Sequence, residues 1–277
     1  ALTAAALIAC SSLNAQTMIE KNDIKLSSDL MTPEALWAMG RIGAAQSSPN
    51  GKKIIYQVGY YSVKENKGHQ MLFIMDADGK QKKQLTHDAA NETDAAWLNN
   101  GEIAFLRNGQ LWCMNIDGEN RRQLTHSKID IEGFKLSPDG KQVILIKSIP
   151  YYGSIQKRPT DLPKSTGRII TDLNYRHWDH YVETIAHPFL ATVTPSGIDE
   201  GTDILGDKPY ECPMAPWGGI EELAWSPDSK DIAYTCRKKT GVEYATSTDA
   251  DIYLYQISNK QTRNLCKPEN YKEPTTD

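Results

Sequence analysis

Short apolar runs separated by turn sequences recur through most of this chain. Four of these runs are rich in β-branched or other apolar residues and occupy residues 54–58, 103–106, 143–146 and 232–235. A Ser-Pro-Asp-Gly-Lys sequence or a close variant precedes three of them, at residues 48–52, 137–141 and 226–230. Proline fixes φ and glycine accepts a positive φ, so this sequence predicts a tight turn between two strands. The pattern therefore indicates short antiparallel strands.

A second repeated sequence sets the period of the pattern. Gln-Leu-Thr-His occurs at residues 84–87 and again 39 residues later, at residues 123–126. The unit that ends in the second copy reads as four strands, at residues 94–98, 102–107, 110–116 and 121–125. Four short antiparallel strands in a unit of about 40 residues are typical of a β-propeller blade. A β-sandwich is the alternative, but it needs about seven strands and no such repeated sequence.

Four units of this kind are predicted, at residues 47–87, 93–126, 131–207 and 218–267. The third unit is the longest, and its surplus lies between residues 150 and 175, where we expect an insertion, mostly loop, at the tip of a strand. Long insertions into compact domains are often functional. The predicted fold class is all-β: an incomplete β-propeller of about four four-stranded antiparallel blades, with WD40-like or TolB-like repeats. Residues 31–277 are expected to form the N-terminal part of this propeller domain.

The amino end differs from the repeated units because it is uncharged and contains one short apolar run. Residues 1–15 carry no charge, and the apolar run at residues 4–9 is much shorter than the roughly 20 residues that span a bilayer. We expect a secretory signal that lacks its positive n-region and ends at Ala15, which predicts a periplasmic or secreted bacterial protein. Residues 7–10 also resemble a lipobox, and membrane attachment is expected only if Cys10 is lipidated. An apolar first helix is the third alternative, but the segment lacks helical periodicity.

The balance of charged residues excludes one class of binding partner. The chain has 277 residues, with 31 Lys and Arg against 35 Asp and Glu, for a net charge of −4 at pH 7. Without a basic surplus, nucleic acid is not an expected partner.

Beyond Cys10, the cysteines are Cys113, Cys212, Cys236 and Cys266, with no Cys-x-x-Cys spacing. We expect a buried thiol at Cys113, and a disulfide between two of the other three stays open.

The chain lacks the short motifs that usually carry catalysis. It contains no Gly-x-Ser-x-Gly elbow, no phosphate-binding Gly-x-x-x-x-Gly-Lys loop and no His-Glu-x-x-His metal helix. We therefore expect no catalytic residue within these 277 residues, no cofactor and no metal site. A serine hydrolase reaction would need a nucleophile in an activating context, and none is present.

The densest polar cluster contains Arg176, His177 and Asp179 within a Tyr-Arg-His-Trp-Asp-His-Tyr segment. If this segment continues a strand, His177 and His180 point to opposite faces, which argues against a metal site. Two interpretations remain. The cluster packs at a blade edge with its tryptophan buried, or its polar residues contact substrate at the mouth of the propeller.

An acidic pair, Glu221 and Glu222, opens the fourth unit directly after Trp-Gly-Gly-Ile. One interpretation is a solvated turn, in which both carboxylates point into water. The other is an acidic pair that faces a cavity and binds the amine of a peptide, because carboxylates form strong hydrogen bonds with ammonium groups.

Taken together, these motifs resemble the propeller half of the prolyl oligopeptidase family of serine peptidases. The resemblance covers about residues 31–267 and is strongest to secreted bacterial members of the dipeptidyl-peptidase 5 and acylaminoacyl-peptidase type. It implies an α/β-hydrolase domain that follows the propeller, lies outside this chain and carries the Ser, Asp and His triad. In some family members propeller glutamates hold the amino terminus of the substrate. The resemblance transfers that role to Glu221 and Glu222.

Two functions follow from these observations. In the first, the chain is the N-terminal propeller of an exported serine peptidase of the dipeptidyl or oligopeptidase type. The propeller then gates and selects short peptide substrates for the hydrolase domain of the same protein. In the second, the chain belongs to a non-enzymatic TolB-like periplasmic propeller that binds a protein partner. The long insertion and the Arg-His-Trp-Asp cluster favour the peptidase.

Overall fold

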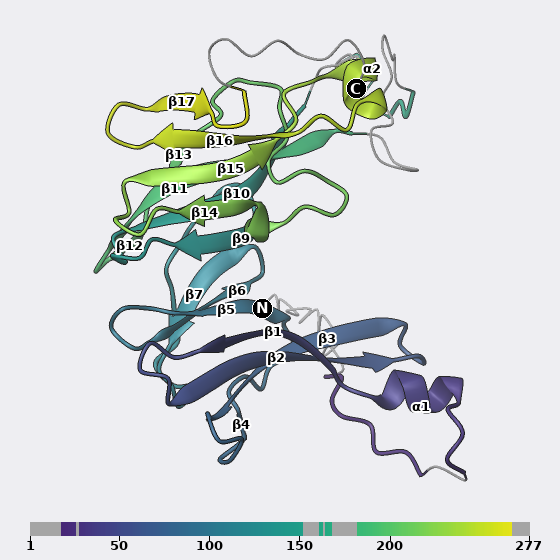
Figure 1. Ribbon diagram of the computed structural model, residues 1–277. Helices are drawn as coiled ribbons and strands as arrows, with labels where there is room; N and C mark the ends of the chain where they lie inside the picture. The colour runs from purple at the N-terminus through teal and green to yellow at the C-terminus, as the bar shows by residue number, and fades with distance from the viewer. Residues whose placement is uncertain (1–17, 26–27, 152–160, 163, 168–181, 268–277) are drawn as a thin grey trace, which may run out of the picture.

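The computed structural model describes residues 18–25, 28–151, 161–162, 164–167 and 182–267. Within these ranges the chain folds into four antiparallel sheets. Figure 1 shows the sheets one beside the next in chain order, with the first and the last at opposite ends. We call them blades 1 to 4. The all-β, propeller-type architecture predicted from the repeats is confirmed.

Each blade contains four main strands in sequential order, and the third blade carries an extra short strand. Blade 1 consists of β1 (Arg41–Ser47), β2 (Lys53–Ser62), β3 (Lys67–Asp76) and β4 (Lys83–Gln84). Blade 2 consists of β5 (Glu92–Trp97), β6 (Ile103–Arg107), β7 (Gln110–Met114) and β8 (Arg122–Gln123). Blade 3 consists of β9 (Ile131–Leu136), β10 (Gln142–Pro150), β11 (Thr184–Thr194), β12 (Gly197–Ile198) and β13 (Thr202–Asp203). Blade 4 consists of β14 (Leu223–Trp225), β15 (Asp231–Cys236), β16 (Asp251–Gln256) and β17 (Gln261–Asn264).

The Ser-Pro-Asp-Gly sequences form the turn between the first two strands of a blade. In blade 3 the Ser137 hydroxyl donates to Asp139 Oδ1 at 2.7 Å and accepts a hydrogen bond from Gln142 N at 3.0 Å. Gly140 has φ +71°, a conformation that L side chains rarely adopt. The same serine and acceptor bonds recur in the turns of blades 1 and 4. The repeated sequence is therefore a repeated turn, as predicted.

The Gln-Leu-Thr-His copies fasten the outer strand of blades 1 and 2 to its neighbour. The Thr86 hydroxyl accepts a hydrogen bond from Leu72 N at 3.0 Å, and the Thr125 hydroxyl accepts one from Leu111 N at 2.9 Å. The threonine thus satisfies a strand amide just past the point where the two-residue outer strand ends.

Hydrophobic cores lie between successive blades. In β6, Ile103 and Phe105 belong to the cluster shared with blade 1, whereas Ala104 and Leu106 belong to the cluster shared with blade 3. Strand β10 alternates in the same way between blades 2 and 4. A strand covered on both faces is apolar at every position, which explains the continuous apolar runs of the sequence.

The structure corrects the start of the first predicted unit, which was placed at residue 47. Strand β1 begins at Arg41 and ends at Ser47. Its central residues are small or polar and mostly exposed, so they lack the apolar signal that marked the other strands. A short helix, α1 (Pro33–Ala38), precedes it and was not predicted, although Thr32 caps its first turn with a hydrogen bond from Ala35 N at 3.2 Å.

The other predictions concern the cysteines, the insertion in the third unit and the amino end. All four described cysteines are free thiols, and Cys113 is buried as expected. Burial raises the pKa of the Cys113 thiol to about 11. The insertion joins β10 to β11, and most of it lies outside the described residues. The predicted signal at residues 1–15 and Cys10 also lie outside them. None of the described helices is long and apolar enough to cross a membrane.

Candidate functional site

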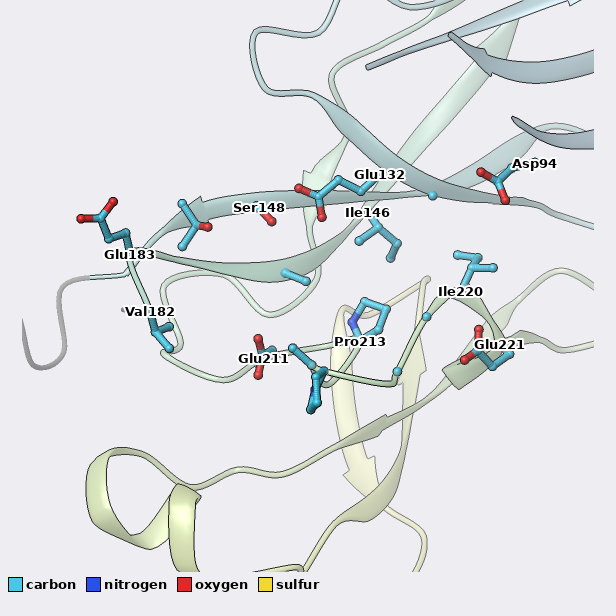
Figure 2. A pocket seen from close by; sticks show the side chains of 17 residues that line it. Asp94, Glu132, Ile146, Ser148, Val182, Glu183, Glu211, Pro213, Ile220 and Glu221 are labelled. Atoms are coloured by element: carbon cyan, nitrogen blue, oxygen red, sulfur yellow. The ribbon is translucent and has the colours of Figure 1, made fainter. Parts of the chain in front are cut away.

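A cavity of about 620 Å³ opens among blades 2, 3 and 4. Three of its acidic residues come from the inner strands or the turn that precedes one: Asp94 from β5, Glu132 from β9 and Glu221 from the 3₁₀ turn η1 (Ile220–Glu222). Two more come from blade 3 and the segment after it, Glu183 and Glu211. Figure 2 shows these carboxylates around the cavity on different elements of the chain.

The described lining of this cavity contains five acidic residues and no lysine or arginine. Its other described residues are mainly small or apolar, among them Ile146, Val182 and Ile220. A concave site whose low-dielectric walls carry one sign of charge concentrates ions of the opposite sign. The cavity therefore suits a ligand with an ammonium group attached to a small apolar body.

The Gly-Gly-Ile-Glu-Glu sequence folds so that its two glutamates have different roles. Glu222 Oε2 accepts a hydrogen bond from Met214 N at 2.8 Å and does not line the cavity, whereas Glu221 is exposed and does. A Cβ on Gly218 would lie 2.6 Å from the Glu222 carboxylate, and one on Gly219 would lie 2.6 Å from Glu221 Oε2. A Cβ on Gly218 would also lie 2.5 Å from the backbone oxygen of Met214, which excludes a side chain there, whereas the Glu221 carboxylate could move away from a Cβ on Gly219.

The carboxylates of this region influence one another. Burial raises the pKa of Glu222, and the negative charges of Glu221 and Glu211 raise it further, against the hydrogen bond from Met214 N. The charges of two cavity residues therefore act on Glu222, although Glu222 itself does not line the cavity.

Among the sequence-predicted site residues, the structure describes Glu221 and Glu222 and places only Glu221 in the cavity lining. Arg176, His177 and Asp179 lie outside the described residues. Within the described ranges, no group of three or more His, Cys, Asp or Glu side chains is placed to hold a metal ion.

Sequence reasoning missed four acidic residues of the cavity: Asp94, Glu132, Glu183 and Glu211. One signal was available, because Glu132 stands five residues before the turn serine Ser137, as Glu221 stands five residues before Ser226. Aligning the repeats would have placed Glu132 and Glu221 at the same position relative to the turn serine of their blades. Glu211 lies in an irregular segment between blades, where no repeat indicates its position.

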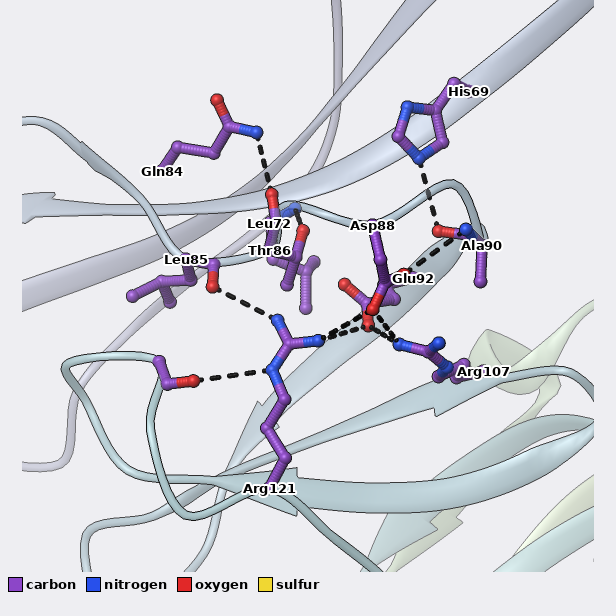
Figure 3. A network of polar contacts seen from close by, with 11 residues as sticks. His69, Leu72, Gln84, Leu85, Thr86, Asp88, Ala90, Glu92, Arg107 and Arg121 are labelled. Atoms are coloured by element: carbon purple, nitrogen blue, oxygen red, sulfur yellow. Dashed lines mark hydrogen bonds and ion pairs between the residues drawn. The ribbon is translucent and has the colours of Figure 1, made fainter. Parts of the chain in front are cut away.

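A second group of carboxylates, at the junction of blades 1 and 2, is neutralised by arginines (Figure 3). Glu92 Oε1 accepts hydrogen bonds from Arg107 Nη1 at 2.8 Å and from Arg121 Nη1 at 2.9 Å, and Asp88 pairs with the same arginines. Arg121 Nη2 also donates to Leu85 O at 3.1 Å. We call these four charged residues the junction cluster. It joins the chain just past blade 1 to β5, to β6 and to the connection between β7 and β8.

The arrangement of four antiparallel blades is shared with solved structures, among them two of acylaminoacyl peptidases. The Pyrococcus horikoshii acylaminoacyl peptidase matches with a TM-score of 0.53 at 12% identity, over 83% of this chain and 33% of that one. An acylaminoacyl peptidase in complex with Z-Gly-Gly-Phe-chloromethyl ketone matches with a TM-score of 0.57 over the same shares.

Sequence relatives specify the relationship further. The chain is 47% identical over 240 residues to dipeptidyl-peptidase 5 of Porphyromonas gingivalis, which covers 85% of this chain and 35% of that protein. It is 40% identical over 243 residues to dipeptidyl-peptidase 5 of Porphyromonas endodontalis, covering 86% of this chain and 35% of that protein. A scan against models of protein families finds no match.

The chain is thus homologous to dipeptidyl-peptidase 5, and the predicted relation to the prolyl oligopeptidase family is confirmed. It spans about a third of the length of these curated relatives.

Proposed function

We propose that this chain is the propeller part of an exported serine peptidase, and that its acidic cavity holds the free amino group of short peptide substrates. Peptide-bond hydrolysis is assigned to an α/β-hydrolase domain outside these residues. The observation that carries the proposal is the cavity itself: five carboxylates and no described lysine or arginine, in a homologue of dipeptidyl-peptidase 5.

The shape of the cavity supports a role in selecting substrates. A volume of about 620 Å³ is enough for a short peptide and too small for a folded protein. Carboxylates on the inner strands of blades 2 and 3, and on the turn that precedes the inner strand of blade 4, attract an ammonium group. The apolar lining favours a small side chain. The propeller then gates access by charge and by size, and the reaction follows by acyl transfer in the hydrolase domain.

The test compares substrates that differ only at the amino terminus. The full-length product of the gene is assayed with a dipeptidyl 4-nitroanilide that has a free amino group and with its N-acetyl counterpart. We expect hydrolysis of the free-amine substrate, and a KM about tenfold higher in Glu221→Gln, because one charge-assisted hydrogen bond is lost. Glu119→Gln, an exposed glutamate outside the cavity, serves as the matched control.

Two results would contradict the proposal. A full-length product without peptidase activity would favour a TolB-like propeller that binds a protein partner. Equal rates for free and acetylated substrates would remove the role of the carboxylates. Export is tested separately by the mass of the mature amino terminus, which we expect to begin at Gln16, in a protein recovered from the periplasm or the medium.

A further inference from the structure

Both ring nitrogens of His69, a buried residue of strand β3, face backbone carbonyl oxygens. Nδ1 lies 2.9 Å from the carbonyl oxygen of Ile19, and Nε2 lies 3.2 Å from that of Ala90. Figure 3 shows the second of these contacts. A carbonyl oxygen only accepts hydrogen bonds, and a neutral imidazole has one N–H whereas an imidazolium has two. Both contacts are therefore hydrogen bonds only when the His69 ring is protonated.

The two carbonyl oxygens belong to different parts of the chain. Ile19 lies in the amino segment, by which we mean residues 18–25, 50 residues before His69. It is the buried residue of that segment, at 8% exposed, and the residues on either side of it are more exposed. Ala90 lies 21 residues after His69, in the connection between blades 1 and 2. His69, itself 3% exposed, therefore joins the amino segment to the junction of these two blades.

No carboxylate of the described residues is hydrogen-bonded to the ring of His69. The charged and titratable groups on the elements around the ring are Glu20, Lys21 and Asp23 in the amino segment, Tyr60 opposite His69 on β2, Lys67 on β3, and Asp88 and Glu92 of the junction cluster. Lys21 pairs with Asp23 at 2.6 Å, and both carboxylates of the junction cluster pair with its arginines. The two carbonyl oxygens are therefore the groups that distinguish the protonated ring from the neutral one.

We propose that His69 is a pH-dependent clamp, whose protonated ring holds the amino segment against the junction of blades 1 and 2 and whose neutral ring releases it. This inference goes beyond the proposed function, since His69 does not line the acidic cavity. A neutral ring donates one hydrogen bond and turns the lone pair of its other nitrogen toward a carbonyl oxygen, which repels it. Histidine changes its charge between about pH 5 and pH 8. The clamp is therefore complete on the acidic side of that range and is lost as the pH rises through it.

The contact that breaks is the one to the amino segment. Ala90 is held by a second bond, because its amide donates to Asp88 Oδ1 at 3.3 Å, and Asp88 belongs to the junction cluster. Ile19 lies in a segment whose other described residues are half-buried or exposed. Loss of one proton from His69 therefore frees the amino segment and leaves the blade junction in place.

The experiment treats the full-length gene product with proteinase K at about pH 5 and at about pH 8. The rate of cleavage within residues 18–25 is divided by the rate for a synthetic peptide of these residues at the same pH, which cancels the pH dependence of the protease. We expect this ratio to be about tenfold higher at the alkaline pH, because one hydrogen bond from a charged donor is lost. His69→Gln should abolish the difference between the two pH values, because an amide does not titrate. His87→Gln, at an exposed histidine just past the outer strand of the same blade, is the matched control and should keep the difference.

The wild-type measurement needs no variant, so it tests the clamp even if His69→Gln does not fold, and His69→Asn then serves as the second variant. An equal ratio at both pH values in the wild type would overturn the inference, and so would a lower ratio at about pH 8. A difference that persists in a folded His69→Gln or His69→Asn protein would assign the effect to another group and remove the clamp. Cleavage throughout the blades at about pH 8, rather than within residues 18–25, would show general unfolding and count equally against it. Peptidase activity enters none of these outcomes, so the test is independent of the proposed function.

Discussion

The junction cluster and the acidic cavity both contain carboxylates from several elements, but in opposite charge environments. In the junction cluster, Glu92 is fully buried and shares both of its arginines with Asp88. In the cavity, the described lining supplies carboxylates from several blades and no lysine or arginine. Removing a carboxylate that pairs with buried arginines leaves those charges uncompensated, whereas carboxylates gathered around a cavity attract a cation. The comparison predicts that substitutions in the first region change stability and those in the second change substrate recognition.

The largest effect is expected from Glu92→Ala. This substitution removes the fully buried carboxylate that Arg107 and Arg121 share, and leaves these two arginines, each about three-quarters buried, with only the partly exposed Asp88. Removing one partner of a buried ion pair costs about 3 kcal/mol in free energy of unfolding. Urea denaturation measures it, and Asp78→Ala, in an exposed pair with Lys80, should leave the unfolding midpoint unchanged. A Glu92→Ala protein as stable as wild type would show that the cluster does not hold the blades together.

An intermediate effect is expected from Glu132 in the cavity. Glu132→Gln should raise KM for a free-amine dipeptide substrate several-fold, and Glu132→Lys should raise it by about tenfold or more, since the new ammonium repels the ligand. Neither variant should change the urea midpoint, because Glu132 is exposed. The opposite outcome, a lower midpoint with unchanged KM, would assign the cavity carboxylates to stability and break the comparison.

The smallest effect concerns pH and has opposite signs at Asp88 of the junction cluster and at Glu222, the neighbour in sequence of the cavity residue Glu221. Burial alone would raise the pKa of Asp88, but the hydrogen bond and charge of Arg107, with the charge of Arg121, hold it below its ordinary 3.8. Its stabilising contribution is present above that value and is lost as the pH falls through the folded-state pKa. The pKa of Glu222 is raised above 4.5, chiefly by burial, so its contribution is present below 4.5 and is lost as the pH rises through the folded-state pKa.

Two variants separate these contributions in urea titrations at a series of pH values. Asp88→Asn should reduce the loss of stability between about pH 5 and pH 3. Glu222→Gln keeps the acceptor for Met214 N and should reduce the loss of stability as the pH rises above 4.5. Identical pH profiles for both variants and the wild type would show that neither shift contributes to stability.

Most of the fold was predictable because its signals are local. The turn serine satisfies a backbone amide five residues further on, and the turn glycines adopt the positive φ that these turns need. The two threonines recur at a fixed place in their repeats, where each accepts a hydrogen bond from the neighbouring strand 14 residues away. The continuous apolar runs follow from burial on both faces of a strand. Strand β1 was not predicted because its small, exposed residues carry no apolar pattern.

The candidate site was predictable only in part. Glu221 was found from its sequence motif, and Glu132 occupies the equivalent position of an adjacent repeat. Glu222 shows the limit of such reasoning, because its carboxylate turns to Met214 N although it is the neighbour of a cavity residue. Which of two adjacent carboxylates faces the cavity depends on the path of the glycine backbone that precedes them.

The sequence by itself determined the repeat, the blade type, the turns and the relation to the prolyl oligopeptidase family, because these depend on short spacings and on residue identity. Only the tertiary structure decided which carboxylates meet. Asp94, Glu132, Glu211 and Glu221 come together because packing of successive blades brings their elements to one cavity. The burial of Glu211 beneath Tyr244, 33 residues away in the chain, is a long-range contact that no local pattern encodes.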